Sequence, residues 1–350
     1  GVYYTELRYG RISFAILEDR KFKSGPQGLV PPTGGRPDHV TDPNFDRRAF
    51  DPPGAQLFGE RQHRFIRHWV ADWRESDMKV AISQTILANA TSYHGQDHTF
   101  LVADLDSNGW PASARNAALR ELRRGFAFML AGDQHLTSVI HHGADDWEDS
   151  GYSFCVPAIN VGYPRSFRPQ TPGENRAPGA PYYTGRFRDG LGNRVTIHAL
   201  GNPEEQLRKP PLEFLHDKAS GHGIVRLHKP SGKITIESWR LLSDPQNVPA
   251  GGQFPGFPIT IRMEDNYGRR AVAWLPEIRV SGMENPVVEV RDEADGELVY
   301  ALRIRGRSFR PKVFRPGTYT VRVGAPETGN VKTFAKVAAG AGGGVLNVAF

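Results

Sequence analysis

The chain of 350 residues has little cysteine and no long apolar run. Its single cysteine, Cys155, excludes an intrachain disulfide, which argues neither for nor against export because a folded metalloenzyme can be stable outside the cell without disulfides. The absence of about 18 consecutive apolar residues predicts no transmembrane helix, and no secretory signal peptide is recognised. Cys155 lies in a strand-like run, which predicts a buried structural thiol.

The charge is of both signs with a moderate basic excess. The sequence has 44 Lys and Arg against 38 Asp and Glu, a formal net charge of +6. A basic surface attracts phosphate-bearing or other anionic partners. The basic residues are not clustered enough to indicate nucleic acid, which is therefore not an expected partner. A chain of this length can bury a large core and predicts two domains.

One strand ends in a cluster of polar residues. The apolar run that starts at Phe126 predicts a buried strand, and it leads directly into Gly132-Asp133-Gln134-His135. The carboxyl end of a core strand is where open α/β sheets place their chemistry. Asp133 and His135 together suit a divalent or trivalent metal that activates water. The alternative is an ordinary turn in which His135 pairs with Asp133.

The motifs around this strand occur in a definite order. In chain order they are a strand over Ile12–Phe22 that closes on Asp19-Arg20, a helix start at Leu57-Phe-Gly-Glu-Arg-Gln62, a strand over Met78–Gln84, the turn Asp104–Pro111, a helix over Ser113–Arg124, and Gly-Asp-Gln-His. This order resembles the later half of PhoD-type alkaline phosphatases, a branch of the calcineurin-like metallophosphatases. That family has Leu-Asp-x-Arg, Leu-Gly-x-x-Gln, Asp-Gly-Tyr-Pro and Gly-Asp-x-His in the same order. Residues 1 to about 240 carry the resemblance, with departures at Glu18-Asp19-Arg20 and Asn108-Gly109-Trp110-Pro111.

The resemblance implies a fold and an activity. The fold would be α/β, the C-terminal part of a layered α/β/β/α metallophosphatase domain. The activity would be hydrolysis of phosphomonoesters or phosphodiesters by metal-activated water, in an extracellular or periplasmic protein. Two metal ions are implied, calcium and iron, with zinc or manganese as alternatives. Arg20 would clamp the phosphate, unless it forms an ion pair with Asp19 or Glu18, and Asp106 and Asn108 lie on the turn that matches Asp-Gly-Tyr-Pro.

The other metal ligands of this family lie upstream of the Asp-x-Arg strand. Upstream of Gly132 the sequence contains no Asp-x-His, Gly-Asp-x-x-Asp or Gly-Asn-His-Asp/Glu. We therefore expect part of a two-metal site, a processed chain, and an N-terminal fragment of the same precursor as a partner. The chain alone is expected to be weak or inactive. The alternative is a non-catalytic structural or surface-attachment protein built on a cleaved or degenerate metallophosphatase scaffold.

Other polar clusters leave alternatives open. His141 and His142 could reach the site if a helix follows His135, but a surface pair is favoured. The segment Asp104–Gly109 matches only the start of a calcium loop. Missing ligands would be sought in this turn and in the loop that carries His94, Asp97 and His98. Four arginines of the helix could face phosphate or, as favoured, solvent; they are Arg115, Arg120, Arg123 and Arg124.

Composition divides the chain into parts. Residues 1–245 form the expected metallophosphatase part, with long loops at 24–56 and 145–192, and 246–257 a linker. Residues 258–350 predict a small β-sandwich with a glycine-rich spacer and a terminal strand. This sandwich is the expected surface for self-association or for a cell-surface polymer. Its arginines from Arg303 to Arg310 could bind such a polymer, although an ordinary outer face is favoured.

Overall fold

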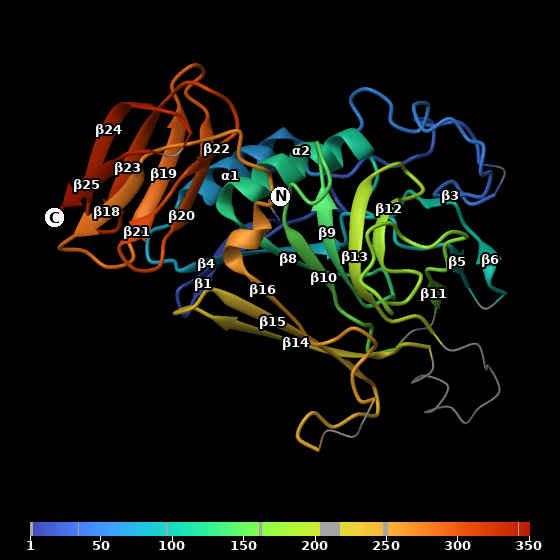
Figure 1. The fold of residues 1–350 in the computed structure, drawn as a ribbon. Coiled ribbons are helices and arrows are strands. Elements are labelled where there is room, and N and C mark those ends of the chain that lie inside the picture. Colours follow the sequence, from blue (N-terminus) through green and yellow to red (C-terminus); the bar gives the residue numbers. More distant parts are fainter. Residues whose placement is uncertain are drawn as a thin grey trace.

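The computed structural model describes residues 3–33, 35–95, 97–160, 163–203, 218–247, 251–341 and 343–350. It is a mixed α/β fold with many strands and few helices (Figure 1). Residues 248–250 of the expected linker and Gly342 of the expected spacer lie outside the described residues. Among the described residues, no helix has the length and apolar character needed to cross a membrane.

An eight-stranded sheet forms the centre of the molecule. Its strand order is β1-β2-β4-β8-β10-β9-β13-β12. Strands β2, β4, β8 and β10 are parallel, and the strands at both sides of them are antiparallel. The bounds are β1 Thr5–Tyr9, β2 Ile12–Ile16, β4 Met78–Thr85, β8 Phe128–Gly132, β9 Ser138–Gly143, β10 Tyr152–Cys155, β12 Gly185–Arg188 and β13 Arg194–Leu200. The predicted strand before Asp133 is therefore confirmed as β8.

Two helices cover one side of this sheet. Helix α1 spans Gly59–Ala71 and α2 spans Ala112–Leu122, followed by a 3-10 turn, η1, over Arg123–Gly125. The three- and four-residue spacing of the apolar residues in this segment predicts one apolar helix face, and this face is buried, as its core residues Ile66, Trp69 and Val70 show.

A small sheet lies on the other side of the main sheet (Figure 1). It consists of β14 (Gly221–His228), β15 (Lys233–Arg240) and β16 (Ile259–Arg262). The turn signature Pro230-Ser231-Gly232 between two strand-like segments predicts a hairpin. Strands β14 and β15 pair antiparallel across residues 229–232, which confirms it. The small sheet packs closely on the core, since a Cβ at Gly223 would lie 2.6 Å from the Phe154 ring.

The C-terminal strands gather at one end of the molecule (Figure 1). One sheet has the order β20-β19-β23-β24, a second has β21-β18-β25, and β17 pairs with β22. The bounds are β17 Ala273–Trp274, β18 Glu277–Ser281, β19 Val287–Asp292, β20 Leu298–Arg303, β21 Ser308–Phe309, β22 Lys312–Val313, β23 Thr318–Ala325, β24 Asn330–Ala338 and β25 Val345–Ala349. A separate sandwich domain stays a prediction, because β16 follows the expected linker and yet pairs with β15.

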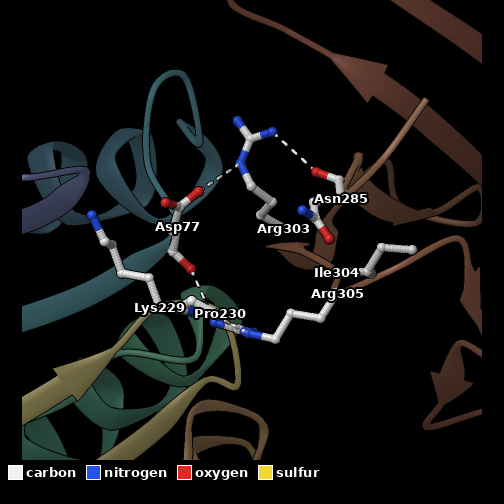
Figure 2. A pocket seen from close by; sticks show the side chains of 7 residues that line it. All are labelled: Asp77, Lys229, Pro230, Asn285, Arg303, Ile304 and Arg305. Atoms are coloured by element: carbon white, nitrogen blue, oxygen red, sulfur yellow. Dashed lines mark hydrogen bonds and ion pairs between the residues drawn. The ribbon is translucent and has the colours of Figure 1, made fainter.

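Arg303 does not lie on an outer face, contrary to the favoured expectation. It is buried and donates hydrogen bonds to Ser76 O at 2.7 Å and to Trp73 O at 2.9 Å. Glu327 supplies its carboxylate partner. Figure 2 shows Arg303 pointing toward Asp77, with Arg303 Nε 3.7 Å from Asp77 Oδ1. The pair lines a pocket of about 260 Å³ between the C-terminal strands, the turn of the β14–β15 hairpin and the segment after α1. Alternation along a strand assigns a side of the sheet, but it does not show that this side packs on another part of the chain.

Arginines of the second helix also differ from expectation. Arg115 is fully buried and Arg123 nearly so, whereas a solvated row was favoured. Arg115 donates to Leu87 O at 3.0 Å and to Gly143 O at 2.6 Å. Arg123 pairs with the buried carboxylate of Asp149 at 2.8 Å. Both guanidiniums are therefore structural, because they bond to protein acceptors, although Arg123 Nε has no hydrogen-bond partner.

We predict that Arg303→Ala destabilises the protein by about 3 kcal/mol, because breaking a buried ion pair leaves Glu327 and three carbonyl groups without a donor. Urea denaturation followed by circular dichroism measures the effect. Arg279→Ala is the matched control, since Arg279 also pairs with a glutamate but its side chain is 59% exposed. Equal denaturation midpoints for wild type and Arg303→Ala would contradict this prediction.

Candidate functional site

The candidate site lies where three strand ends meet. Strands β2, β4 and β8 are neighbours and parallel, so their carboxyl ends meet at the same edge of the sheet. Asp19 follows β2, Ser83 lies near the end of β4, and Asp133 follows β8. The turn after β7 (Ala103–Asp104) completes the site.

Arg20 connects two of the predicted site residues. Its Nη1 contacts Asp106 Oδ1 and its Nη2 contacts Asp133 Oδ2. The partners of Arg20 are therefore Asp106 and Asp133, and the alternative partners Asp19 and Glu18 are wrong. All three side chains are about two-fifths exposed, so solvent or a ligand reaches the guanidinium.

Asp133 and His135 lie next to each other beyond β8. The distance between His135 Nε2 and Asp133 Oδ1 is 3.5 Å. His135 Nδ1 lies 2.6 Å from the carbonyl oxygen of Tyr163. Because a carbonyl oxygen only accepts hydrogen bonds, Nδ1 carries the proton, and in the neutral ring the lone pair is on Nε2, next to Asp133.

The backbone at this strand end is strained. Asp133 has φ of 50° and His135 has φ of 53°, in the left-handed region that side chains with a Cβ rarely adopt. Such residues persist where the surrounding structure holds them, and they cluster at active sites and ligand clamps. Here the strain lets two alternate residues present their polar groups at the same edge.

Beneath Arg20 lies a buried polar network. Asp19 is fully buried, and its Oδ1 accepts from the Ser83 hydroxyl at 3.1 Å, while its Oδ2 has no partner. Asn108 is also fully buried; its amide donates to Ser83 Oγ at 3.2 Å and to Thr85 O at 3.0 Å, while its Oδ1 has no partner. Buried polar atoms are normally paired, so these two oxygens lack the hydrogen-bond partner that burial usually requires. Sequence reasoning included Asn108 but missed Asp19 as a potential ligand. The position of Asp19 after β2 was the signal that could have identified it.

Lys23 holds the turn that carries Asp106. Its Nζ donates to the carbonyl oxygens of residues 105, 106 and 107 at 2.7, 2.9 and 2.7 Å. Burial lowers the pKa of Lys23 to about 8, while the nearby carboxylates of Asp106 and Asp19 oppose this shift. Lys23 thus connects the segment after β2 to the turn after β7.

A second cluster lies beside the first. Asp38, His39 and Asp104 have one potential ligand atom each, and these atoms lie within 4.8 Å of one another. The centroids of the His39 and His94 rings are 4.2 Å apart. His94, one of the three residues singled out in its loop, therefore lies beside this second cluster. The neighbouring Asp97 and His98 are exposed.

His141 and His142 do not form the expected surface pair. The segment is the strand β9 rather than a helix, and both side chains are buried. His142 bonds to Ser153 Oγ at 2.7 Å through Nε2, and burial lowers the pKa of both rings. They are core histidines. Cys155 is buried as predicted, which raises the pKa of its thiol to about 12.

The residues at β8 fit a metal ion. Neighbouring ligand atoms of an ion with bonds of about 2.1 Å lie about 3.0–3.4 Å apart, close to the 3.5 Å between Asp133 Oδ1 and His135 Nε2. The Tyr163 carbonyl group orients the histidine, as is usual for metal ligands. The other predicted carboxylate, Asp106, contacts Arg20.

Comparisons with known proteins give little further information. No family model matches the chain, and no curated protein matches it. Among solved structures, the chain is similar to one described as "Structure of PhoD", with 10% identity and a TM-score of 0.38. The match covers 99% of this chain and 46% of that chain, so the chain spans about half the length of that protein. A TM-score and identity this low assign neither a family nor an activity.

We predict that Lys23→Met loosens the turn at residues 105–107, because three carbonyl groups lose their donor at a cost of roughly 1–3 kcal/mol. Amide hydrogen exchange of the peptide that contains this turn should become faster. Lys21→Met is the control, since the exposed Lys21 ammonium group lies over the Tyr3 ring instead. Unchanged exchange in Lys23→Met would show that the turn does not depend on Lys23.

We further predict that His135→Ala lowers metal affinity at this strand end by more than about 10–100-fold, the range typical even for residues that only orient a ligand. Elemental analysis after equilibration with calcium, iron, manganese or zinc measures the bound ion. His68→Ala serves as the control because His68 is exposed on α1. Unchanged metal content in His135→Ala, where wild type holds metal, would exclude the assignment.

Proposed function

We propose that this chain is part of a metal-dependent phosphoric ester hydrolase that acts on phosphomonoesters or phosphodiesters. The observation that carries the proposal is the guanidinium of Arg20, which contacts Asp106 and Asp133 beside the pair Asp133 and His135. A fixed guanidinium beside metal-ligating groups is the arrangement that phosphoryl transfer requires.

The residues divide the work. Asp133 and His135 would hold the metal, and a bound metal supplies Lewis acidity and an activated water. Arg20 binds phosphate oxygens through its planar fork of donors, and Asp106 and Asp133 orient this fork. Asp106, two-fifths exposed, is placed to accept a proton at the mouth of the site. Asn108 acts through the turn, because its buried amide group bonds to β4.

The proposal includes an upstream partner. A two-metal site needs carboxylates that hold the ions about 3.5–4 Å apart, and Asp133 with His135 is too small a set. An N-terminal fragment of the same precursor would supply the remaining ligands. Calcium and iron are the proposed ions, with zinc or manganese as alternatives, in an extracellular or periplasmic protein.

A second candidate is a non-catalytic attachment protein on a degenerate scaffold. It is favoured by the saturation of Arg20, whose two carboxylate partners compete with any incoming phosphate. The two candidates differ in the response to inorganic phosphate: an enzyme site exchanges the carboxylates for the anion, and a degenerate site does not. The C-terminal strands would then provide self-association or contact with a cell-surface polymer.

We predict that the 350-residue chain alone hydrolyses aryl phosphate monoesters and diesters barely above background with calcium, iron, manganese or zinc. Adding the upstream fragment should restore metal-dependent turnover. In the restored complex, Arg20→Ala should lower kcat/KM by about 10²–10³, the loss expected when one donor to developing charge is removed. Arg307→Ala is the control, since Arg307 pairs with exposed Glu284 on the C-terminal part.

Two outcomes would contradict this. Robust metal-dependent turnover by the chain alone would mean that its ligand set is complete. The attachment protein would be favoured if the complex showed no turnover and if inorganic phosphate changed the thermal stability of neither wild type nor Arg20→Ala.

A further inference from the structure

We propose that Asp38, His39 and Asp104 form a metal site separate from the pair at β8, a structural clip between the 24–56 loop and the turn that carries Asp106. The clip goes beyond the proposed function, because it requires no phosphoryl chemistry. Its ligands come from two segments far apart in sequence, which short strands bring together.

The backbone fixes two ligands on one rung. Strand β3 (His39–Val40) pairs antiparallel with β7, and His39 lies directly opposite Asp104. The pairing continues through hydrogen bonds from Leu105 N to Asp38 O at 2.7 Å and from Val102 N to Val40 O at 2.8 Å. Cβ atoms of directly opposite residues are about 4.5–5.5 Å apart, so two side chains on the same face can share one ion.

An unpartnered nitrogen points to a missing ligand. His39 is 5% exposed and its Nε2 has no hydrogen-bond partner, although Asp38 Oδ2 lies 3.8 Å away. Asp104 is fully buried, and its Oδ2 forms an ion pair with Arg165 Nη1 at 2.7 Å, without the geometry of a hydrogen bond. A buried imidazole nitrogen without a partner costs free energy, and a cation held between His39 and the carboxylate groups of Asp38 and Asp104 would satisfy it.

The surrounding charges permit a cation here. Arg36 donates to Asp38 at 2.8 and 3.1 Å, but its own side chain is 59% exposed and can turn to solvent. Arg165 cannot turn to solvent in the same way, because it is buried and its Nη1 lies 2.7 Å from Asp104 Oδ2. Without Arg36, the remaining Asp38, Asp104 and Arg165 carry a net charge of −1.

One imidazole nitrogen and two carboxylate oxygens suit zinc, cobalt or manganese, whereas calcium prefers oxygen alone. Ligand atoms of a tetrahedral ion with bonds of about 2.1 Å are about 3.4 Å apart. The 3.8 Å between His39 Nε2 and Asp38 Oδ2 needs a contraction of a few tenths of an ångström. Water or the adjacent His94 ring completes the coordination.

The test uses the full chain, freed of metal by a chelator and titrated with Co²⁺, whose visible absorption reports nitrogen and oxygen coordination. His135→Ala, which lacks the histidine ligand at β8, should bind one equivalent with this signature. Adding His39→Ala or Asp38→Asn to His135→Ala should weaken that binding at least tenfold. Zinc should raise the melting temperature of His135→Ala by at least about 2 °C and leave that of the double variant His39→Ala/His135→Ala unchanged. The controls are His68→Ala and Asp42→Asn, which alter exposed residues.

Binding of Co²⁺ by the two double variants as tight as by His135→Ala would overturn the clip, as would a His135→Ala variant that binds none of zinc, cobalt and manganese. Asp38→Asn keeps the shape of the side chain, and circular dichroism verifies that each variant is folded. The outcome is independent of the proposed function. If His135→Ala still binds metal at the clip but shows no phosphoester turnover, the clip stands whether or not the proposed function does.

Discussion

The contact of Arg20 with Asp106 and Asp133 is the interaction on which the candidate site depends. It joins the segment after β2, the turn after β7 and the end of β8, three parts of the chain that the parallel sheet brings to one edge. Two half-exposed carboxylates would repel each other without the guanidinium between them. The same cation is the group that an anionic substrate must engage. Assembly of the site and recognition of an anion therefore rest on one side chain, and Lys23 supports it by fixing the turn.

Much of this arrangement followed from the sequence, because it depends on local patterns. The apolar run before Asp133 predicted β8, the helical spacing predicted the buried face of α1, and the turn at residues 229–232 predicted the hairpin. The convergence of Arg20 with Asp106 and Asp133 agrees with the assignment of these residues to one site. Patterns at strand ends are informative because neighbouring parallel strands present their carboxyl ends at a common edge.

The sequence failed where burial depends on a distant partner. Arg115, Arg303 and His142 are polar residues for which exposure is the usual expectation. Each can be buried because a group many residues away forms a hydrogen bond with it: a carbonyl oxygen for each arginine and the Ser153 hydroxyl for His142. The pairing of His39 with Asp104 was missed for a related reason. Strands of two residues within long loops have no periodicity, so nothing in the local sequence indicates which residues face each other.

Tyr163 makes the two clusters part of one framework. Its carbonyl oxygen holds Nδ1 of His135, and its hydroxyl contacts Nδ1 of His94, whose ring stacks on that of Tyr163 and meets that of His39. A shift of this residue would move both histidines, since each is oriented through its second ring nitrogen. The range 145–192, expected as a long loop, contains the strands β10, β11 and β12. Tyr163 lies two residues before β11 (Arg165–Ser166), which pairs with β5 (Tyr93–His94). The pairing of β11 with β5 is thereby coupled to the geometry at the end of β8, because Tyr163 orients the His135 ring and so determines how His135 presents its Nε2 lone pair.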